Sequence, residues 1–458
     1  MLDFLISVLA FIVAISVLVA VHEYGHFWVA RRLGFKVLRF SIGFGRPLLR
    51  WRSKGADPVD YWISAIPLGG YVKMLDEREE EVPEAEAHRA FNRQPIWARI
   101  LVLLAGPGAN FVFAVAAFWL MYVTGVQSVR PYVEDVRAGT VAAEAGLRSD
   151  DIIEAIGGKR TPTLDQALVA MFDELLGDSV IELDVIEADG DRREVVLDVR
   201  GRVSELTEPD ALFDGLGIVM GPSPPAIVGS VTEGDPADLA GLEEGDRIVA
   251  LDGRPITYFA ELADYVGARP GQSIELTIER GGERLDVPIV AASAVDDGAT
   301  VGRIGIGSRP DTRENLAERV NASRRYGPIE SIGVAAAETW AMTELTTRML
   351  ARMVTGEVPL KNVSGPLMIA SYAGDYAQAG FNRFLQFLCL ISISLGIMNL
   401  LPVPILDGGQ IVMSLVEGVK GSPLSVRAAV IGQQIGLAML IVLMSFVFYN
   451  DITRLFGL

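Results

Sequence analysis

Cysteine and histidine are both rare in this chain, whose 458 residues include one cysteine and three histidines. Cys389 has no partner cysteine, so no intrachain disulfide stabilises any domain, and its place in an apolar run indicates a buried, inert thiol. No basic residue precedes the first apolar run, where Asp3 stands instead. This lack, together with the length of the run, predicts a retained membrane helix rather than a cleaved signal peptide.

Basic residues are fewer than acidic ones: the chain has 40 Lys and Arg and 58 Asp and Glu, which gives a formal net charge of −18. Residues 127–309 carry 36 acidic and 16 basic side chains, a balance of −20, and so account for the whole excess. Such a segment repels nucleic-acid phosphates, which argues against nucleic acid as a partner. Solubility alone explains an acidic surface of this kind.

Long apolar runs are plentiful, and half of the residues are apolar. Four runs, at about residues 2–30, 100–124, 384–401 and 426–448, reach or approach the ~20 residues that cross ~30 Å of hydrocarbon. We therefore expect an α-helical membrane bundle of four transmembrane helices, with a water-soluble insert between the second and third.

The loop after the first run contains eight basic and no acidic residues: Arg31, Arg32, Lys36, Arg39, Arg46, Arg50, Arg52 and Lys54. The positive-inside rule places this loop in the cytoplasm. Both termini and the acidic insert are then expected on the opposite side, which is the periplasm for a protein of a bacterial inner membrane.

Two of the three histidines form His22-Glu23-Tyr24-Gly25-His26 near the end of the first run. Because residues i and i+4 share one face of a helix, both imidazoles can bind one Zn²⁺, and Glu23 is placed to act as general base. A pair of structural histidines is the alternative, but ionisable groups within a bilayer cost about 2.5 kcal/mol or more on insertion scales. The position along the helix predicts a site below the cytoplasmic membrane surface, away from the midplane.

A hydrolytic zinc site needs a third protein ligand and an open position for water. The candidate ligand is Asp407, in a segment where Pro402 and Pro404 must interrupt a helix. Non-helical backbone at membrane depth is tolerated where it lines a protein cavity or site. Asn399 is a candidate for binding an oxyanion or the substrate backbone. An ordinary loop after the third run would explain the prolines, but not an acid within an apolar segment.

Residues 61–74 are typical of a strand or hairpin that touches the membrane, with a break at Gly69 and Gly70 that permits close backbone approach. A substrate helix must be unwound before it is cut, and an edge strand that includes Tyr71 and Val72 can hold the extended backbone by strand addition. A plain membrane-surface hairpin is the alternative.

In combination, these motifs resemble the site-2 protease family of intramembrane zinc metalloproteases. The resemblance rests on the paired histidines, on Leu406-Asp407-Gly408, and on residues 64–74, which are similar to the family's membrane-associated β-element. Gly106-Pro107-Gly108-Ala109-Asn110, near the start of the second run, resembles its Gly-Pro-x-x-Asn element. The resemblance covers nearly the whole chain.

The resemblance implies a zinc endopeptidase with His22, His26 and Asp407 as ligands and Glu23 as the base. It also implies a role in regulated intramembrane proteolysis, as the second cut of a single-span protein such as a membrane anti-sigma factor already trimmed by a periplasmic protease. Remnant signal peptides are a second expected class of substrate.

The acidic insert contains an internal repeat, because residues 145–153 recur as residues 240–248, offset by 95 positions. Each copy is followed by a turn, a helical stretch and two strand-like runs, which resembles tandem, circularly permuted PDZ domains of the α+β class at 127–221 and 222–309. PDZ modules bind peptide ends by strand addition. Beyond them, an amphipathic helix is expected over 328–356.

The expected order of the other parts is a first span with the zinc motif (1–31), a cytoplasmic loop with the β-hairpin (32–99) and a second span (100–126). A linker with the amphipathic helix (310–380), a third span with the broken segment (381–411) and a fourth span with the C-terminus (412–458) follow the insert. A non-catalytic PDZ receptor would have lost Glu23 or Asp407, and both are present. A zinc transporter would spread polar residues over several spans, whereas here they gather at one site.

Overall fold

The computed structural model describes residues 2–55, 57–187, 189–208, 211–221, 224–296, 299–309 and 320–456. The chain divides into two compact units, one of residues 127–323 and one that combines 2–126 with 324–458. Residues 310–319, the first part of the expected linker, lie outside the described residues.

Four long apolar helices form the basis of the second unit, namely α1 (Leu2–Arg32), α2 (Ile96–Thr124), α12 (Phe381–Asn399) and α14 (Val426–Phe456). Each contains a stretch long and apolar enough to cross a membrane, which confirms the four spans predicted from the sequence. Three further helices belong to the same unit: α10 (Glu330–Thr355), α11 (Pro366–Gln378) and α13 (Asp407–Lys420). The sequence predicted α10, which ends at the left-handed Gly356, but not α11 or α13.

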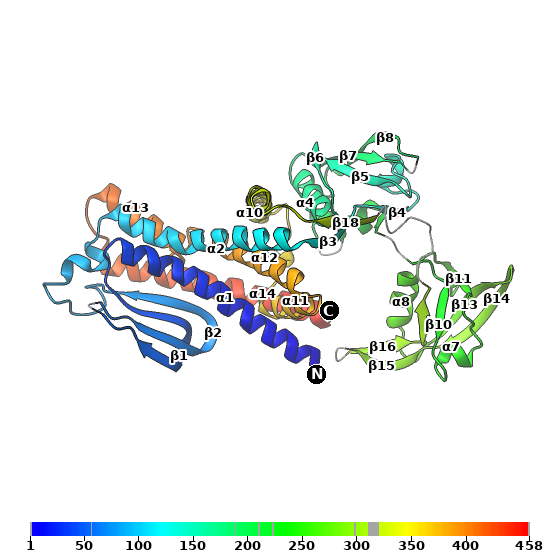
Figure 1. The fold of residues 1–458 in the computed structure, drawn as a ribbon, viewed down its shortest axis with the longest axis horizontal. Helices are drawn as coiled ribbons and strands as arrows, with labels where there is room; N and C mark the ends of the chain where they lie inside the picture. The colour runs from blue at the N-terminus through cyan, green and yellow to red at the C-terminus, as the bar shows by residue number, and fades with distance from the viewer. Residues whose placement is uncertain are drawn as a thin grey trace. The chain divides into compact units, whose positions relative to one another are not determined.

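Helix α2 is central to this unit, because it packs against α1, α10, α12 and α13 (Figure 1). Small residues take part in its contact with α1, where Gly25 of α1 lies against Ala105 and Ala109 of α2, and Ala14 and Ala114 are buried in the apolar cluster that these helices share. In lipid no hydrophobic force drives helices together, so small side chains matter because they permit close van der Waals packing. Cys389 of α12 is buried in the same cluster.

The C-terminal end of α14 is held by the fully buried Asp451. Its carboxylate accepts hydrogen bonds from the backbone N–H groups of Gly365 (2.7 Å), Leu367 (3.0 Å) and Met368 (3.2 Å). The first N–H groups of a helix have no acceptor within that helix. Asp451 therefore caps α11 from a different helix and ties the end of the fourth span to it.

A β-element follows α1 and consists of β1 (Val37–Arg52) and β2 (Asp60–Met74). Both strands bend, so that Phe40 pairs with Val72 on one side and with Tyr61 on the other, while Tyr61 also pairs with Trp51. The sheet consequently has four segments side by side, in the order 47–52, 60–64, 39–44 and 70–74. Residues 70–74 form one edge of the resulting sheet. Two short 3₁₀ helices, η1 (Ala87–Arg89) and η2 (Phe91–Arg93), lead from it to α2.

The unit of residues 127–323 contains two similar halves. The first has a sheet of order β6-β5-β7-β8, and the second has a sheet of order β12-β11-β13-β14. Its elements are β4 (Val133–Val136), α3 (Val141–Glu144), β5 (Ile152–Ile156), β6 (Lys159–Arg160), α4 (Leu164–Leu175), β7 (Val180–Ile186), β8 (Arg192–Asp198), α5 (Val203–Leu206), α6 (Ala211–Leu216), β9 (Ile218–Met220), β10 (Val228–Val231), α7 (Pro236–Leu239), β11 (Arg247–Leu251), β12 (Arg254–Pro255), α8 (Phe259–Gly267), β13 (Ser273–Arg280), β14 (Glu283–Val290), β15 (Ala292–Asp296), β16 (Ala299–Arg303) and β17 (Ile306–Ser308). At the junction with the helical unit, β3 (Val126–Val129) pairs with β18 (Asn321–Arg324).

The sequence repeat corresponds to one buried ion pair that occurs in both halves. Asp151 pairs with Arg193 at 2.8 Å and accepts the backbone N–H of Arg148 at 3.0 Å. At the equivalent place Asp246 pairs with Arg280 at 2.6 Å and accepts the N–H of Glu243 at 2.8 Å. The two carboxylates are 95 positions apart, so the repeat read from the sequence is also a repeat of structure.

Candidate metal centre

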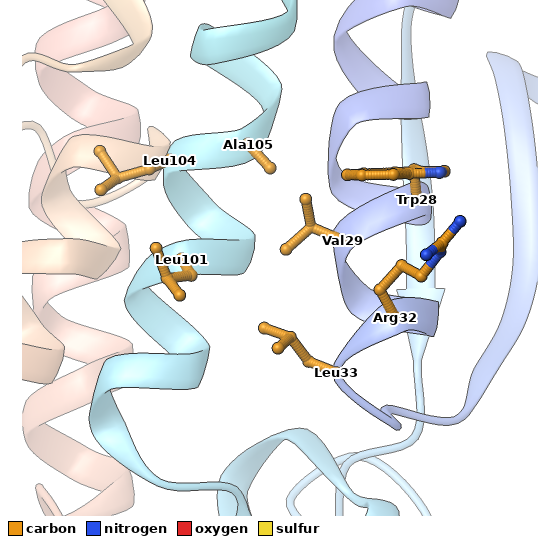
Figure 2. A pocket seen from close by; sticks show the side chains of 7 residues that line it. All are labelled: Trp28, Val29, Arg32, Leu33, Leu101, Leu104 and Ala105. Atoms are coloured by element: carbon orange, nitrogen blue, oxygen red, sulfur yellow. The ribbon is translucent and has the colours of Figure 1, made fainter.

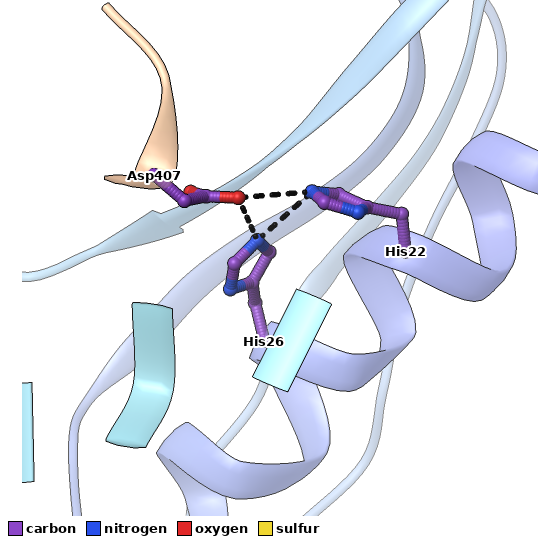
Figure 3. Close-up of side chains that lie close together, drawn as sticks. All are labelled: His22, His26 and Asp407. Carbon is purple, nitrogen blue, oxygen red and sulfur yellow. Dashed lines mark hydrogen bonds and ion pairs between the residues drawn. The ribbon is translucent and has the colours of Figure 1, made fainter. Parts of the chain in front are cut away.

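Three side chains from distant parts of the chain meet in the helical unit. Asp407 Oδ2 lies 3.2 Å from His22 Nε2 and 3.4 Å from His26 Nε2, and the two imidazole nitrogens are 3.2 Å apart (Figure 3). Three corners of a tetrahedron around zinc are about 3.3–3.4 Å apart when the ligand bonds are about 2.0–2.1 Å. The donor atoms therefore fit one zinc ion, and their two-nitrogen, one-oxygen chemistry is that of a hydrolytic site.

The fold of α1 places both imidazoles on one face, because four residues are about one helical turn. His26 is buried, and its Nδ1 donates a hydrogen bond of 2.7 Å to the carbonyl oxygen of Val102 in α2. This bond keeps the proton on Nδ1 and leaves Nε2 as the nitrogen that can bind a metal. The packing of α2 on α1 thus selects the tautomer of His26.

His22 has a different partner, Asn110 of α2. The Asn110 amide nitrogen lies 3.1 Å from His22 Nδ1, while the buried Asn110 Oδ1 has no hydrogen-bond partner among the residues that the structure describes. When His22 offers Nε2 to a metal, Nδ1 carries the proton and needs an acceptor. Reversing the amide, whose oxygen and nitrogen have nearly the same shape, pairs Nδ1–H with Oδ1. Ligation by His22 therefore accounts for the orphaned oxygen.

Two glycines allow α1 and α2 to approach at the site. A Cβ atom at Gly106 would collide with His26 Nε2 and lie 2.8 Å from His22 Nε2, so a side chain there would fill the space that the metal needs. A Cβ at Gly25 would collide with the carbonyl oxygen of Ala105 and would lie 2.7 Å from Ala109 Cβ. Both positions require the smallest residue for steric reasons rather than for backbone freedom.

Asp407 is brought to the histidines by a break in the helical chain. Helix α12 ends at Asn399 and α13 begins at Asp407, so the segment that contains the two prolines is non-helical. Gly408 and Gly409 pack directly on the backbone of residues 400–404, where Cβ atoms would collide. At its other end α13 is held to α2 by a buried ion pair, in which Arg99 Nη2 lies 2.6 Å from Glu417 Oε2.

Glu23 lies between the metal ligands and the β-element. It is close enough to both His26 and Asp407 to interact electrostatically with them. On its other side is Gly70, where a Cβ atom would lie 2.9 Å from Glu23 Cγ and 2.8 Å from Val19 Cγ1. The edge segment 70–74 of the sheet consequently lies directly against the part of α1 that carries the predicted base.

The other predicted contact residues of the β-element lie beside this point. Gly69 has a positive φ of 140°, and a Cβ there would collide with the ring of Phe44. The Tyr71 hydroxyl accepts a hydrogen bond of 3.0 Å from Arg39, and its ring stacks on Phe44 with 6.3 Å between the centroids. Val72 packs into the apolar cluster under the sheet. The side chains of Tyr71 and Val72 are thus fixed by the sheet itself.

Asn399 is the last residue of α12 and stands at the start of the broken segment that leads to Asp407. It is half-buried, and its side-chain amide makes no hydrogen bond to any residue that the structure describes. An amide with no internal partner at the end of the helix before the ligand retains its capacity to bind another molecule.

Three residues of this site were not predicted individually. Asn110 and Gly106 belong to the Gly-Pro-x-x-Asn element, which the sequence singled out without giving either residue a role. The four-residue step from Gly106 to Asn110 was a usable signal, because it places both on one face of α2. Val102 acts through its carbonyl oxygen, so no side-chain pattern could have identified it.

Comparison with known proteins identifies relatives over nearly the full length. Residues 10–443 match the family described as Peptidase family M50. Regulator of sigma-E protease RseP of Escherichia coli (strain K12) is 41% identical over 457 residues, which cover 99% of this chain and 100% of that protein. A protein of Vibrio cholerae named as a zinc metalloprotease is 36% identical over 460 residues, with 99% and 100% covered. A solved PDZ domain of the SdrC-like protein from Listeria monocytogenes is 27% identical over 20% of this chain and 93% of its own, with a TM-score of 0.17.

Proposed function

Because this chain belongs to peptidase family M50, we propose that it cleaves peptide bonds within the transmembrane segments of single-span membrane proteins. It is a zinc metalloendopeptidase of the inner membrane, and we propose both the roles of particular residues and the class of substrate. The observation that supports the assignment most strongly is the spacing of the three donor atoms, at 3.2–3.4 Å from one another.

In the proposed mechanism His22, His26 and Asp407 hold the metal. Zinc, when bound, supplies a Lewis acid that lowers the pKa of the attacking water. Glu23 accepts a proton from that water and delivers it to the nitrogen of the leaving amine, which preserves the proton balance of hydrolysis. The proximity of Glu23 to His26 and Asp407 supports this role.

We assign substrate capture to the edge segment 70–74. The amide groups of a helical substrate are bonded internally, so hydrolysis needs an extended backbone at the metal. An edge strand supplies free backbone donors and acceptors to such a segment, and Gly70 brings this edge into contact with Glu23. We also assign to the amide of Asn399, which has no hydrogen-bond partner among the described residues, the binding of the substrate backbone or of the developing oxyanion.

The biological role that we propose is the second cut in regulated intramembrane proteolysis. One relative, 41% identical over nearly the full length, is named as a regulator of sigma-E protease. This name supports a membrane anti-sigma factor, already trimmed by a periplasmic protease, as a substrate. Remnant signal peptides are a second substrate class. The basic loop at residues 31–54 supports a cytoplasmic position for the β-element, with the termini and the two PDZ-like domains in the periplasm.

The test is a cleavage assay with the purified full-length protein in detergent and a trimmed single-span substrate. We expect cleavage inside the transmembrane segment, its loss on addition of a zinc chelator and its recovery on addition of zinc. Glu23→Gln serves as the matched inactive protein, because it keeps all three metal ligands. If the chelated protein and the zinc-loaded Glu23→Gln variant both cleave the substrate at the rate of the untreated protein, the proposed function is wrong.

A further inference from the structure

A groove that the catalytic function does not use lies between α1 and α2. Its walls are Val29 from the last turn of α1, Leu33 directly after that helix, and Leu101, Leu104 and Ala105 from the facing turns of α2 (Figure 2). Leu101 and Leu104 remain 46% and 40% exposed in the described chain, so much of their apolar surface is open. An open apolar groove between two membrane-spanning helices faces hydrocarbon, and an acyl chain fits that chemistry.

Cationic and aromatic side chains stand at the α1 side of this groove. Arg32 lines it, and its guanidinium carbon lies 5.1 Å from the ring centre of Trp28, which is 49% exposed. Arg31, one residue earlier, lies 5.7 Å from the ring centre of Phe27. Both arginines are exposed, and neither forms an ion pair with a carboxylate in the described parts of the chain. Their charge is left for a ligand from outside the protein.

We propose that this groove binds one anionic glycerophospholipid, with an acyl chain against the apolar wall and the phosphodiester at Arg32. Guanidinium groups bind phosphate oxygens through charge-assisted, often bidentate hydrogen bonds. A tryptophan beside them is typical of the headgroup level of a membrane. An apolar wall with an adjacent cation that has no carboxylate partner in the described chain matches a lipid more completely than it matches a free anion, which would leave the wall uncovered.

The anionic class is favoured by the charge of the surroundings. Arg31 and Arg32 begin a stretch of eight basic residues that extends to Lys54 and contains no acid. A zwitterionic lipid brings its own cation to this positive surface, whereas an anionic lipid does not. Basic residues close to an anionic lipid surface are attracted to it, and clusters of them bind it more strongly.

The α1–α2 contact that forms the groove also contributes to the proposed metal centre. Leu101 precedes Val102, whose carbonyl oxygen accepts the hydrogen bond from His26. A lipid that bridges α1 and α2 binds the folded chain and not the unfolded one, so it must stabilise the protein by mass action. Lipid binding is therefore measurable in two ways, as retained lipid and as a rise in the melting temperature.

The experiment uses the full-length protein, delipidated in a neutral detergent. Phosphatidylglycerol and phosphatidylcholine with identical acyl chains are added in parallel, and bound lipid is counted by native mass spectrometry. A third arm uses inorganic phosphate. We expect one phosphatidylglycerol to be retained in preference to phosphatidylcholine, with a rise in melting temperature, and no stabilisation by phosphate alone.

Two variants test the two halves of the groove separately. Arg32→Gln is expected to weaken phosphatidylglycerol binding about tenfold, which corresponds to the loss of one charge-assisted hydrogen bond. Ala105→Leu fills the apolar wall and is expected to reduce binding of both lipids. Arg427→Gln removes an exposed arginine at the start of α14, outside the groove, and is the control that should leave binding unchanged.

Equal retention of the two lipids by the unaltered protein would overturn the proposal. The proposal would also be overturned if the folded Arg32→Gln and Ala105→Leu proteins bound phosphatidylglycerol as tightly as the unaltered protein does. Stabilisation by inorganic phosphate alone would show a simple anion site and would equally contradict it. None of these readouts depends on proteolysis, so they are independent of the proposed catalytic function.

Discussion

Asn110 of α2 faces His22 of α1 across the helix contact, with 3.1 Å between the amide nitrogen and His22 Nδ1. Asn110 is completely buried, and its backbone carbonyl oxygen accepts a hydrogen bond of 3.0 Å from Ser392 of α12. The residue therefore joins three spanning helices at the metal centre. It contacts the proposed metal site only through His22, which makes it a positioning residue.

The first prediction concerns this contact. Asn110→Ala removes the acceptor for His22 Nδ1–H, so zinc affinity should fall about 10–100-fold, the usual cost of losing a partner of a ligating histidine. Asn110→Asp restores an acceptor and should recover much of the affinity. Ser392→Ala removes the adjacent hydrogen bond only and should bind zinc normally. Chelator competition with metal analysis measures all three, and unchanged affinity in Asn110→Ala would disprove the role.

The second prediction concerns the base. Glu23→Gln keeps the three donor atoms that lie within 3.4 Å of one another, so the variant should hold stoichiometric zinc. Its cleavage rate should fall about 10²–10⁴-fold, the usual contribution of general acid–base catalysis. Zinc content and turnover are measured on the same preparation. Substantial turnover by the zinc-loaded variant would remove Glu23 from the mechanism.

The third prediction concerns the ligand that comes from the broken segment. Asp407→Ala leaves only two protein ligands, so zinc occupancy should drop well below one per chain and cleavage should cease. Asp451→Asn alters a buried aspartate of the same unit, the one that caps α11, and should lower stability while zinc occupancy stays normal. An Asp407→Ala protein with full zinc and normal cleavage would mean that another residue is the third ligand.

The fourth prediction concerns the edge of the β-element. Tyr71→Pro or Val72→Pro removes a backbone N–H from segment 70–74, so cleavage should fall while zinc content stays unchanged. Tyr71→Phe is the matched control, because it loses only the hydroxyl that accepts from Arg39 and keeps the backbone donor. If both proline variants cleave at the normal rate, the element is a plain hairpin at the membrane surface.

The three proposed metal ligands could be predicted from the sequence, because each prediction depends on a local rule. The helical period alone puts His22 and His26 on one face, and the two prolines before Asp407 require a break at the place where a carboxylate is needed. Asn110 and Val102 depend instead on the register in which α2 packs against α1. No local pattern encodes that register, so their contacts could not be derived.

The strand pairing within the β-element could not be predicted from the sequence, for a related reason. Alternation predicted a strand or hairpin, but Phe40 pairs with both Val72 and Tyr61, which requires the strands to bend back on themselves. Gly43 and Gly45 have φ values of 87° and 85° and supply the bend in β1. Helix α13 was missed because a short amphipathic helix after the prolines does not stand out from the apolar runs on either side.

The final prediction concerns the two PDZ-like domains, which we expect to restrain proteolysis rather than to take part in it. Residues 127–323 form a compact unit with their own hydrophobic clusters, while all three metal ligands belong to the other unit. A folded pair of domains on the periplasmic side would exclude proteins with large periplasmic domains and admit trimmed ones. Its balance of −20 could also repel acidic partners, although screening over about 8 Å makes this a secondary effect.

Deletion of residues 131–309 tests whether the two domains exclude untrimmed substrates. The deletion leaves the paired strands β3 and β18 in place. The shortened protein should bind zinc, cleave the trimmed substrate at a normal rate and also cleave the untrimmed form, which the complete chain should reject. Trimmed and untrimmed versions of one substrate are compared with both proteins, and zinc analysis shows whether the helical unit remains folded. A zinc-loaded deletion protein that cleaves neither substrate would show that the domains are required for activity. One that still rejects the untrimmed form would place the filter elsewhere, because the bulk proposed to exclude large periplasmic domains would no longer be present.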